Sequence, residues 1–186
     1  MTTCTDTEGY NNFSEFASYS YELVKYLIEN NELVFKLLKY NTPSAWKEST
    51  PNLTKEEKGA LVYGGIGDGA GFNIFLSNGM PDVVVNEKSL LTVAPYFLSG
   101  RNRSIANLSI MMEIYVHYKI VSLSNYKSRT DVIAQQLLET FNGAILDELG
   151  IGRMYFDKLG FSQLSSERAG QLPFKGRTIL FGINMA

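Results

Sequence analysis

The segment from Ala106 to Ile120 constrains the fold more than any other part of the sequence. Every even-numbered position in it is apolar, whereas the odd-numbered positions are mostly polar. Because side chains alternate between the two faces of a β-strand, this pattern predicts one strand with a dry face and a largely wet face. Its fifteen residues would extend about 50 Å, whereas a compact body of this length is about 40 Å across. We therefore expect the strand to bend or to project, with its missing cover supplied by another copy or by a partner.

Helical spacing of apolar residues marks four other segments. Three of them precede the long strand, and the fourth follows it. The third begins with Thr54 and Glu57, the spacing of a capping box. The predicted helices are Phe13–Ile28, Leu33–Leu38, Thr54–Val62 and Ser128–Ile145.

Shorter segments are candidates for the remaining strands. Asn78-Gly79 is a dipeptide favoured in hairpin turns, and Pro95 predicts that the strand containing it lies at a sheet edge. A strand interrupted near Asp157-Lys158 and a closing strand complete the pattern. The candidate strands are Phe72–Leu76, Val83–Val85, Leu91–Phe97, Met154–Phe161 and Ile179–Met185. The order predicts an α+β fold: N-terminal helices, then a mostly antiparallel sheet with one long strand packed on a central helix.

Composition limits the classes of protein that remain. The 186 residues fit a single domain spanning residues 1–186, with residues 1–10 as a tail. A net charge of -2 gives no general basic excess for binding nucleic acid. With one cysteine, Cys4, and one histidine, His117, no Cys/His metal cluster and no internal disulfide are expected. We therefore expect no metal and no cofactor. Neither a secretion signal nor a membrane span is apparent, so we expect a cytoplasmic site of synthesis.

The segment from residue 64 to 71 reads GGIGDGAG. Glycine-rich turns bring backbone N–H groups close to phosphates, so a nucleotide site is one interpretation. However, the Lys and Ser or Thr of a P-loop are missing, and a helix rather than a strand precedes the glycines. We favour an extended loop, residues 64–82, that orders against a partner. Its candidate contact residues are Gly65, Gly67, Gly69 and Gly71.

Four further residues are candidates for subunit or partner contacts rather than for catalysis. Tyr115 and His117 occupy the polar register of the long strand, where a solvated or interface position is expected. Arg101 and Arg103 lie in the turn that leads into it and suit contacts with an acidic surface or with phosphate. No Ser or Asp at recognisable spacing joins His117 in a triad, so no catalytic residue is predicted.

The order of elements from the long strand onward resembles a known group. An amphipathic strand (Asn107–Lys119) is followed by a helix beginning Arg129-Thr-Asp131, a strand near residues 153–156 and a closing strand, residues 176–183. This order resembles the neck proteins of tailed bacteriophages: the tail-terminator, tail-completion and head-to-tail connector ring subunits. It covers about residues 90–186 and brings no catalytic residue with it.

The resemblance implies a structural virion protein that forms a homo-oligomeric ring between the portal and the tail. Such rings use heterologous contacts, in which a surface meets a different surface of the neighbour. The expected partners are other neck, portal or tail proteins, with packaged DNA passing through the channel without sequence-specific binding, and the expected locations are the virion and, during assembly, the host cytoplasm. The alternative is a small cytoplasmic phosphate- or nucleotide-binding module that uses the 64–71 loop.

Overall fold

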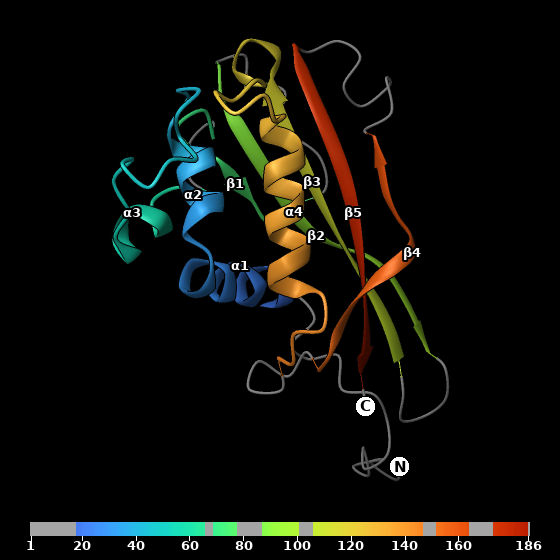
Figure 1. Ribbon diagram of the computed structural model, residues 1–186. Helices are drawn as coiled ribbons and strands as arrows, with labels where there is room; N and C mark the ends of the chain where they lie inside the picture. Colours follow the sequence, from blue (N-terminus) through green and yellow to red (C-terminus); the bar gives the residue numbers. More distant parts are fainter. Residues whose placement is uncertain are drawn as a thin grey trace, which may run out of the picture.

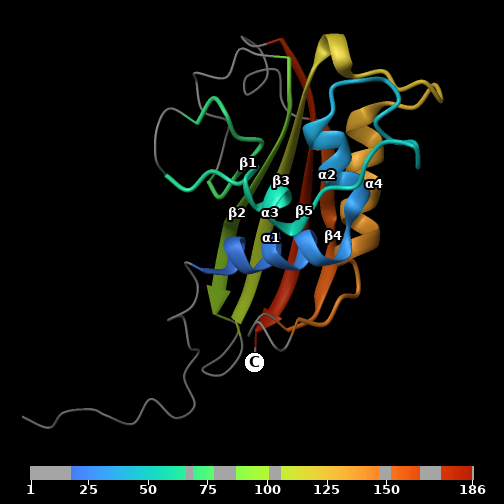
Figure 2. The ribbon, with the colours of Figure 1, turned by 90° about the vertical axis from the view of Figure 1, so that its left-hand side faces the viewer.

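The computed structural model describes residues 18–65, 69–77, 87–100, 106–146, 152–163 and 173–185. A layer of helices covers one face of a twisted sheet (Figure 1). Helix α4 packs against β3 and β5, while α1 and α2 lie over β2. The view at right angles shows the sheet face-on, with α1 crossing in front of its strands (Figure 2). The predicted α+β class is therefore confirmed.

The sheet has five strands in the order β1-β2-β3-β5-β4. The short strand β1 runs parallel to β2, and all other neighbours are antiparallel. The ladder between β4 and β5 is irregular between Phe156 and Phe161, which confirms the predicted interruption near Asp157. The strands are β1 (Ile74–Phe75), β2 (Ser89–Gly100), β3 (Ala106–His117), β4 (Met154–Gln163) and β5 (Phe174–Met185).

Four α-helices are described: α1 (Tyr19–Asn30), α2 (Glu32–Lys39), α3 (Lys55–Gly59) and α4 (Arg129–Phe141). The capping box is confirmed, because the Thr54 side chain accepts from the Glu57 backbone and the Glu57 carboxylate accepts from the Thr54 backbone. Helix α3 is shorter than predicted, since Val62 forms a parallel bridge with Ile74 instead of continuing the helix. The predicted start of the first helix at Phe13 lies outside the described residues.

Strand β3 is shorter than predicted and is matched by its neighbours. It ends at His117, and Tyr118–Ile120 form a 3-10 turn. Strands β2, β3 and β5 each have twelve residues, and the latter two pair along their whole length. The prediction that this strand outgrows the body is therefore wrong. Its even-numbered residues from Leu108 to Val116 are buried, as expected.

The prediction that the odd-numbered face of β3 is wet is also wrong. Met111, Glu113, Tyr115 and His117 are all at most 4% exposed. A second apolar cluster covers part of this face: Phe75, Leu90, Tyr115 and Phe174, with Tyr63 and Phe72 packed against it. The part of β3 from Met111 to His117 is thus buried on both faces, and the loop after α3 covers part of its second face.

Pro95 lies where the prediction places it, on an open edge. In β2, Leu91 N donates to Asn73 O of the chain leading into β1, so alternate residues of β2 turn their N–H away from β3. Pro95 belongs to the same alternate set, and its missing N–H therefore costs no ladder hydrogen bond. Among the residues that the structure describes, no strand pairs with β2 on this side beyond Thr92.

The hairpin turn expected at Asn78-Gly79 would join β1 to the predicted strand Val83–Val85, not to β2, with which β1 pairs in parallel. The dipeptide and the predicted strand Val83–Val85 lie outside the described residues.

Arg129, the first residue of α4, is completely buried and joins three elements. Its guanidinium donates to four backbone oxygens, those of Leu37, Tyr40, Thr42 and Ile120, at 2.6–2.9 Å. Three of these oxygens lie at or just beyond the end of α2, where the helix dipole favours a cation. Desolvation lowers the pKa of Arg129 to about 10, so the side chain is still charged at neutral pH.

Candidate assembly surface

The two residues predicted to contact partners from β3 are turned into the protein. The Tyr115 hydroxyl donates to Glu113 Oε2 at 2.9 Å, and both side chains are buried. His117 Nδ1 accepts from Lys119 N at 3.3 Å, and its ring packs edge-on against Phe174. Neither Tyr115 nor His117 therefore presents useful surface in this structure.

The glycine-rich loop is folded onto its own chain where it is described. Gly65 and Gly69 have positive φ angles of 84° and 76°. Glycine adopts such angles at little energetic cost, whereas a residue with a Cβ is strained there. A Cβ on Gly69 would lie 3.1 Å from Phe75 Cε1, so the loop packs closely there. Gly71 is exposed.

A lysine contacts this loop from β2's side. Lys88 Nζ donates to Ala70 O, and burial lowers the pKa of Lys88. The ammonium group thus binds a carbonyl of the loop itself. The other predicted contact residues, Gly67, Arg101 and Arg103, lie outside the described residues.

A row of side chains across the lower end of the sheet is the surface that the sequence reasoning missed. The register pairs Phe97 of β2 with Ser109 of β3, and Ser109 with Gly182 of β5. Gly182 in turn pairs with Tyr155 of β4. These four residues, called the aromatic row below, therefore lie side by side on the face of the sheet away from the helices.

The aromatic side chains at the two ends of the aromatic row are exposed, whereas the two residues between them are small. Phe97 is 58% exposed and Tyr155 is 39% exposed. A Cβ on Gly182 would lie only 2.3 Å from Tyr155 Cζ, so the tyrosine ring covers the glycine. The row thus runs from the exposed Phe97 ring, past the small side chain of Ser109, to the Tyr155 ring, which lies over Gly182.

The open edge of β2 carries two further exposed apolar residues. Tyr96 is 56% exposed. Leu98 is 37% exposed, but it pairs with Leu108 and therefore lies on the other face of the sheet from the aromatic row. The register between β2 and β3 shifts between Pro95 and Phe97, which places Tyr96 in a bulge. A bulge and a proline both hinder the addition of another strand, so this edge suits contacts between side chains better than strand pairing.

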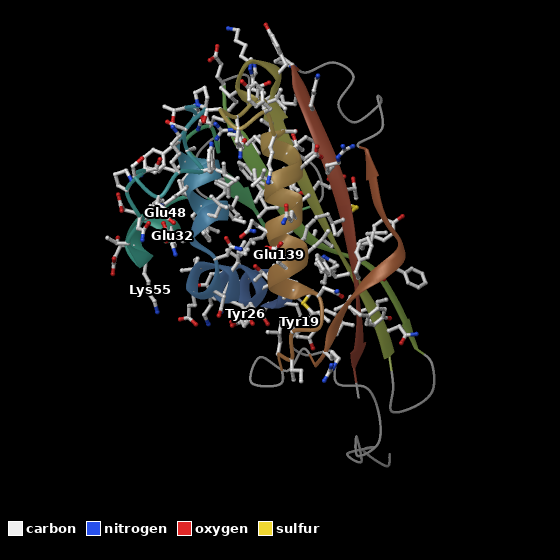
Figure 3. The ribbon with its side chains drawn as sticks, in the orientation of Figure 1. Tyr19, Tyr26, Glu32, Glu48, Lys55 and Glu139 are labelled. Atoms are coloured by element: carbon white, nitrogen blue, oxygen red, sulfur yellow. The ribbon has the colours of Figure 1, made fainter. Side chains whose placement is uncertain are left out.

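The helical layer has a different character. Figure 3 shows Glu48 and Lys55 on its outer side, away from the sheet. Lys55 Nζ lies 3.0 Å from Glu29 Oε1, and both side chains are well exposed. This solvated face contrasts with the aromatic row, none of whose four members is charged.

A run of large apolar residues directly after an edge proline, Tyr96-Phe97-Leu98, is the signal that could have found this surface in the sequence. Elsewhere in the described part of the chain, no three His, Cys, Asp or Glu side chains gather as metal ligands. Over the same ranges, no helix is long and apolar enough to cross a membrane.

Fold and surface together define an α+β protein whose sheet has an open end with exposed aromatic side chains. The family model of YomW matches residues 30–182, and the chain belongs to this family. Membership indicates a phage-associated protein. A comparison with the curated proteins finds no match to this chain.

Proposed function

We propose that this phage-associated protein is a non-enzymatic neck subunit of a tailed phage. In this proposal it forms a homo-oligomeric ring that joins the portal side to the tail side and lines or seals the DNA channel. The observation that carries it is the exposed aromatic row with its neighbour Tyr96 at the open edge. A folded chain with a well-filled core has no internal use for these side chains, and association would cover them.

The surface supports assembly through specific packing rather than through strand exchange. Pro95 and the bulge at Tyr96 protect the edge from open-ended pairing. Exposed Tyr and Phe side chains supply large contact areas at a low entropy cost, and such residues often dominate the affinity of an interface. The net charge of -2 also suits a channel through which DNA passes without being bound.

Two features that the sequence predicted do not support the proposed ring-forming function. Strand β3 is covered within its own chain, so it does not require another copy for its apolar face. Tyr115 and His117 are buried as well. The proposal therefore depends on family membership, on the order of elements and on the open end of the sheet.

The test is native mass spectrometry and negative-stain imaging of the full chain, alone and with the other neck proteins of its phage. We expect closed rings of one stoichiometry. Phe97→Ser should weaken assembly, whereas the control Tyr21→Ser should not, because Tyr21 is 51% exposed on α1, in the other layer. Monomers alone under every condition would contradict the proposal.

A thermal-shift screen tests the nucleotide-binding alternative. Because Lys88 already binds the glycine-rich loop's own carbonyl, we expect ATP, GTP and NAD to leave the melting temperature unchanged. A rise of several degrees with one of them would favour a binding module instead.

A further inference from the structure

His117, the last residue of β3, ties the end of that strand to the 3-10 turn Tyr118–Ile120. Its Nδ1 accepts from Lys119 N at 3.3 Å, so the imidazole ring caps the turn. In a neutral imidazole one ring nitrogen donates and the other accepts, whereas in the protonated ring both donate. The cap therefore requires a neutral ring that carries its proton on Nε2.

Packing on two sides favours this orientation of the ring. The His117 ring stacks on Tyr118 with the ring centroids 4.8 Å apart, and it meets Phe174 edge-on with the centroids 5.5 Å apart. The strand below it is fixed as well, because His117 N donates to Lys88 O at 3.0 Å. Nδ1 is thus held facing the Lys119 amide.

The turn that His117 caps joins several segments at one end of the sheet, where Ser89, His117 and Phe174 lie and which is called the closed end below. Tyr118 N donates to Pro173 O at 2.9 Å, directly before β5. On the other side, Ile120 O accepts from Arg129 Nε at 2.9 Å. A change in the turn therefore reaches both the sheet and the helical layer.

One carboxylate beside the ring attracts two cationic groups. The Lys119 ammonium forms an ion pair with the Glu87 carboxylate. Hydrogen bonding from Lys119 lowers the pKa of Glu87, and the charge of His117 acts in the same direction with a smaller effect. The same hydrogen bond raises the pKa of Lys119. A protonated His117 and Lys119 would thus compete for Glu87.

The other titratable groups around this end, within the described ranges, do not offer a protonated His117 a better partner. The Lys88 ammonium donates to Ala70 O, and Lys175 is exposed next to Phe174. Farther along the same face of β3, the buried Glu113 carboxylate accepts from the Tyr115 hydroxyl. The groups concerned are Glu87, Lys88, Glu113, Tyr115, Tyr118, Lys119 and Lys175.

We propose that His117 is a pH-sensitive lock of the closed end. Protonation places a hydrogen on Nδ1, so the ring no longer accepts from the Lys119 amide, and two N–H groups then face each other. The capped turn requires the neutral ring, whereas the open turn accepts either form, so added protons favour the open turn. The lock holds at pH 7.5 and releases below about pH 6, within the range in which histidine ordinarily titrates. This device goes beyond the proposed ring and does not depend on it.

The unchanged full chain allows the first test. Because the chain has one histidine, NMR resonances of a histidine ring belong to His117 alone. We expect the Nε2–H tautomer at pH 7.5 and, from pH 8 to pH 5, a Lys119 amide resonance that shifts with the same midpoint as the ring. A proton on Nδ1 at pH 7.5, or a Lys119 amide that does not follow the ring, would overturn the proposal.

Matched variants give the second test. In His117→Asn the side-chain oxygen is a favoured capping acceptor that does not titrate, whereas His117→Leu has no acceptor. Hydrogen–deuterium exchange across residues 117–121 is measured at pH 7.5 and pH 5.0 and divided by the intrinsic rate at each pH. Between these pH values the unchanged chain should lose protection by about fivefold, the effect of one hydrogen bond.

The variants should then differ from the unchanged chain in opposite ways. His117→Asn should keep the same protection at both pH values, and His117→Leu should be poorly protected at both. Peptides from α1, in the helical layer, serve as the internal control and should not change. An equal loss of protection in the unchanged chain and in His117→Asn would mean that another group senses the pH, and the proposal would be wrong.

Discussion

The two ends of one pair of strands, β2 and β3, differ in how their second face is covered. At the closed end, Leu90 and Tyr115 face each other in register and are almost inaccessible, as is Glu113. At the open end, Phe97 pairs with Ser109 on the same face and is 58% exposed. The alternation of side chains is continuous in β3, and the bulge at Tyr96 shifts β2 by one residue, so Leu90 and Phe97 lie on the same face. The difference in exposure therefore comes from what other segments place over each end.

An amphipathic strand pattern therefore identifies the face that packs on the main core, but it does not show whether the other face is buried or exposed to solvent. The sequence pattern predicts that Glu113, Tyr115 and His117 face solvent. Aromatic residues from distant segments, Phe75 and Phe174 among them, instead cover that end of the strand. Where such cover stops, the same strands present an apolar surface. The four predictions below test the two ends separately.

The largest expected effect comes from Arg129→Met, which removes the charge that anchors the helical layer at the closed end. Four backbone oxygens would lose their donors, and the free energy of unfolding should fall by about 3–5 kcal/mol. Urea denaturation followed by circular dichroism measures this. Arg153→Met, at an exposed arginine, is the control and should change little; a loss below about 1 kcal/mol for Arg129→Met would contradict the account.

The second prediction compares the ends directly. Ile114→Ala, at a completely buried residue, should cost about 2–4 kcal/mol because it leaves a cavity. Phe97→Ser removes more apolar surface but should stay within about 0.5 kcal/mol, since its ring is exposed in the subunit. The comparison must be made on monomers at low concentration. Similar losses for both variants would show that the two ends do not differ.

The third prediction concerns the buried polar pair at the closed end. Tyr115→Phe deletes the hydroxyl that donates to Glu113 and should cost about 1–2 kcal/mol, because a buried carboxylate loses a hydrogen bond. The matched variant Tyr118→Phe, at a residue that is 54% exposed, should be neutral. Thermal unfolding of the two variants side by side decides it, and equal melting temperatures would refute the assigned role of the hydroxyl.

The smallest effect is expected at the open end, from Gly182→Ala. The added Cβ would collide with the Tyr155 ring, but that ring lies at the sheet edge and can move, so the cost should be about 1 kcal/mol. In a Tyr155→Ser background the same change should become neutral or stabilising, since glycine weakens a strand. A double-mutant cycle measures the difference; an equal cost in both backgrounds would mean that the ring does not cover Gly182.

Local patterns predicted most of the elements. The capping box at Thr54, the edge position of Pro95 and the break near Asp157 were all readable because each depends on neighbours in the sequence. The burial of Tyr115 and His117 was not readable, since it depends on residues such as Phe75 and Phe174 that only the fold brings close. Arg129 was missed for the same reason: its four acceptors lie up to 92 positions away.

Only part of the candidate surface could be predicted from the sequence. The run Tyr96-Phe97-Leu98 after Pro95 could have marked an open edge, but its alignment with Gly182 and Tyr155 depends on the strand order β3-β5-β4.

Hydrogen–deuterium exchange of the full chain, compared between dilute monomer and concentrated assembly, tests the central claim most directly. The account predicts added protection in peptides spanning residues 96–100 and 153–156, and unchanged exchange across residues 89–94 at the closed end. Protection that grows elsewhere while these two segments exchange as before would contradict it.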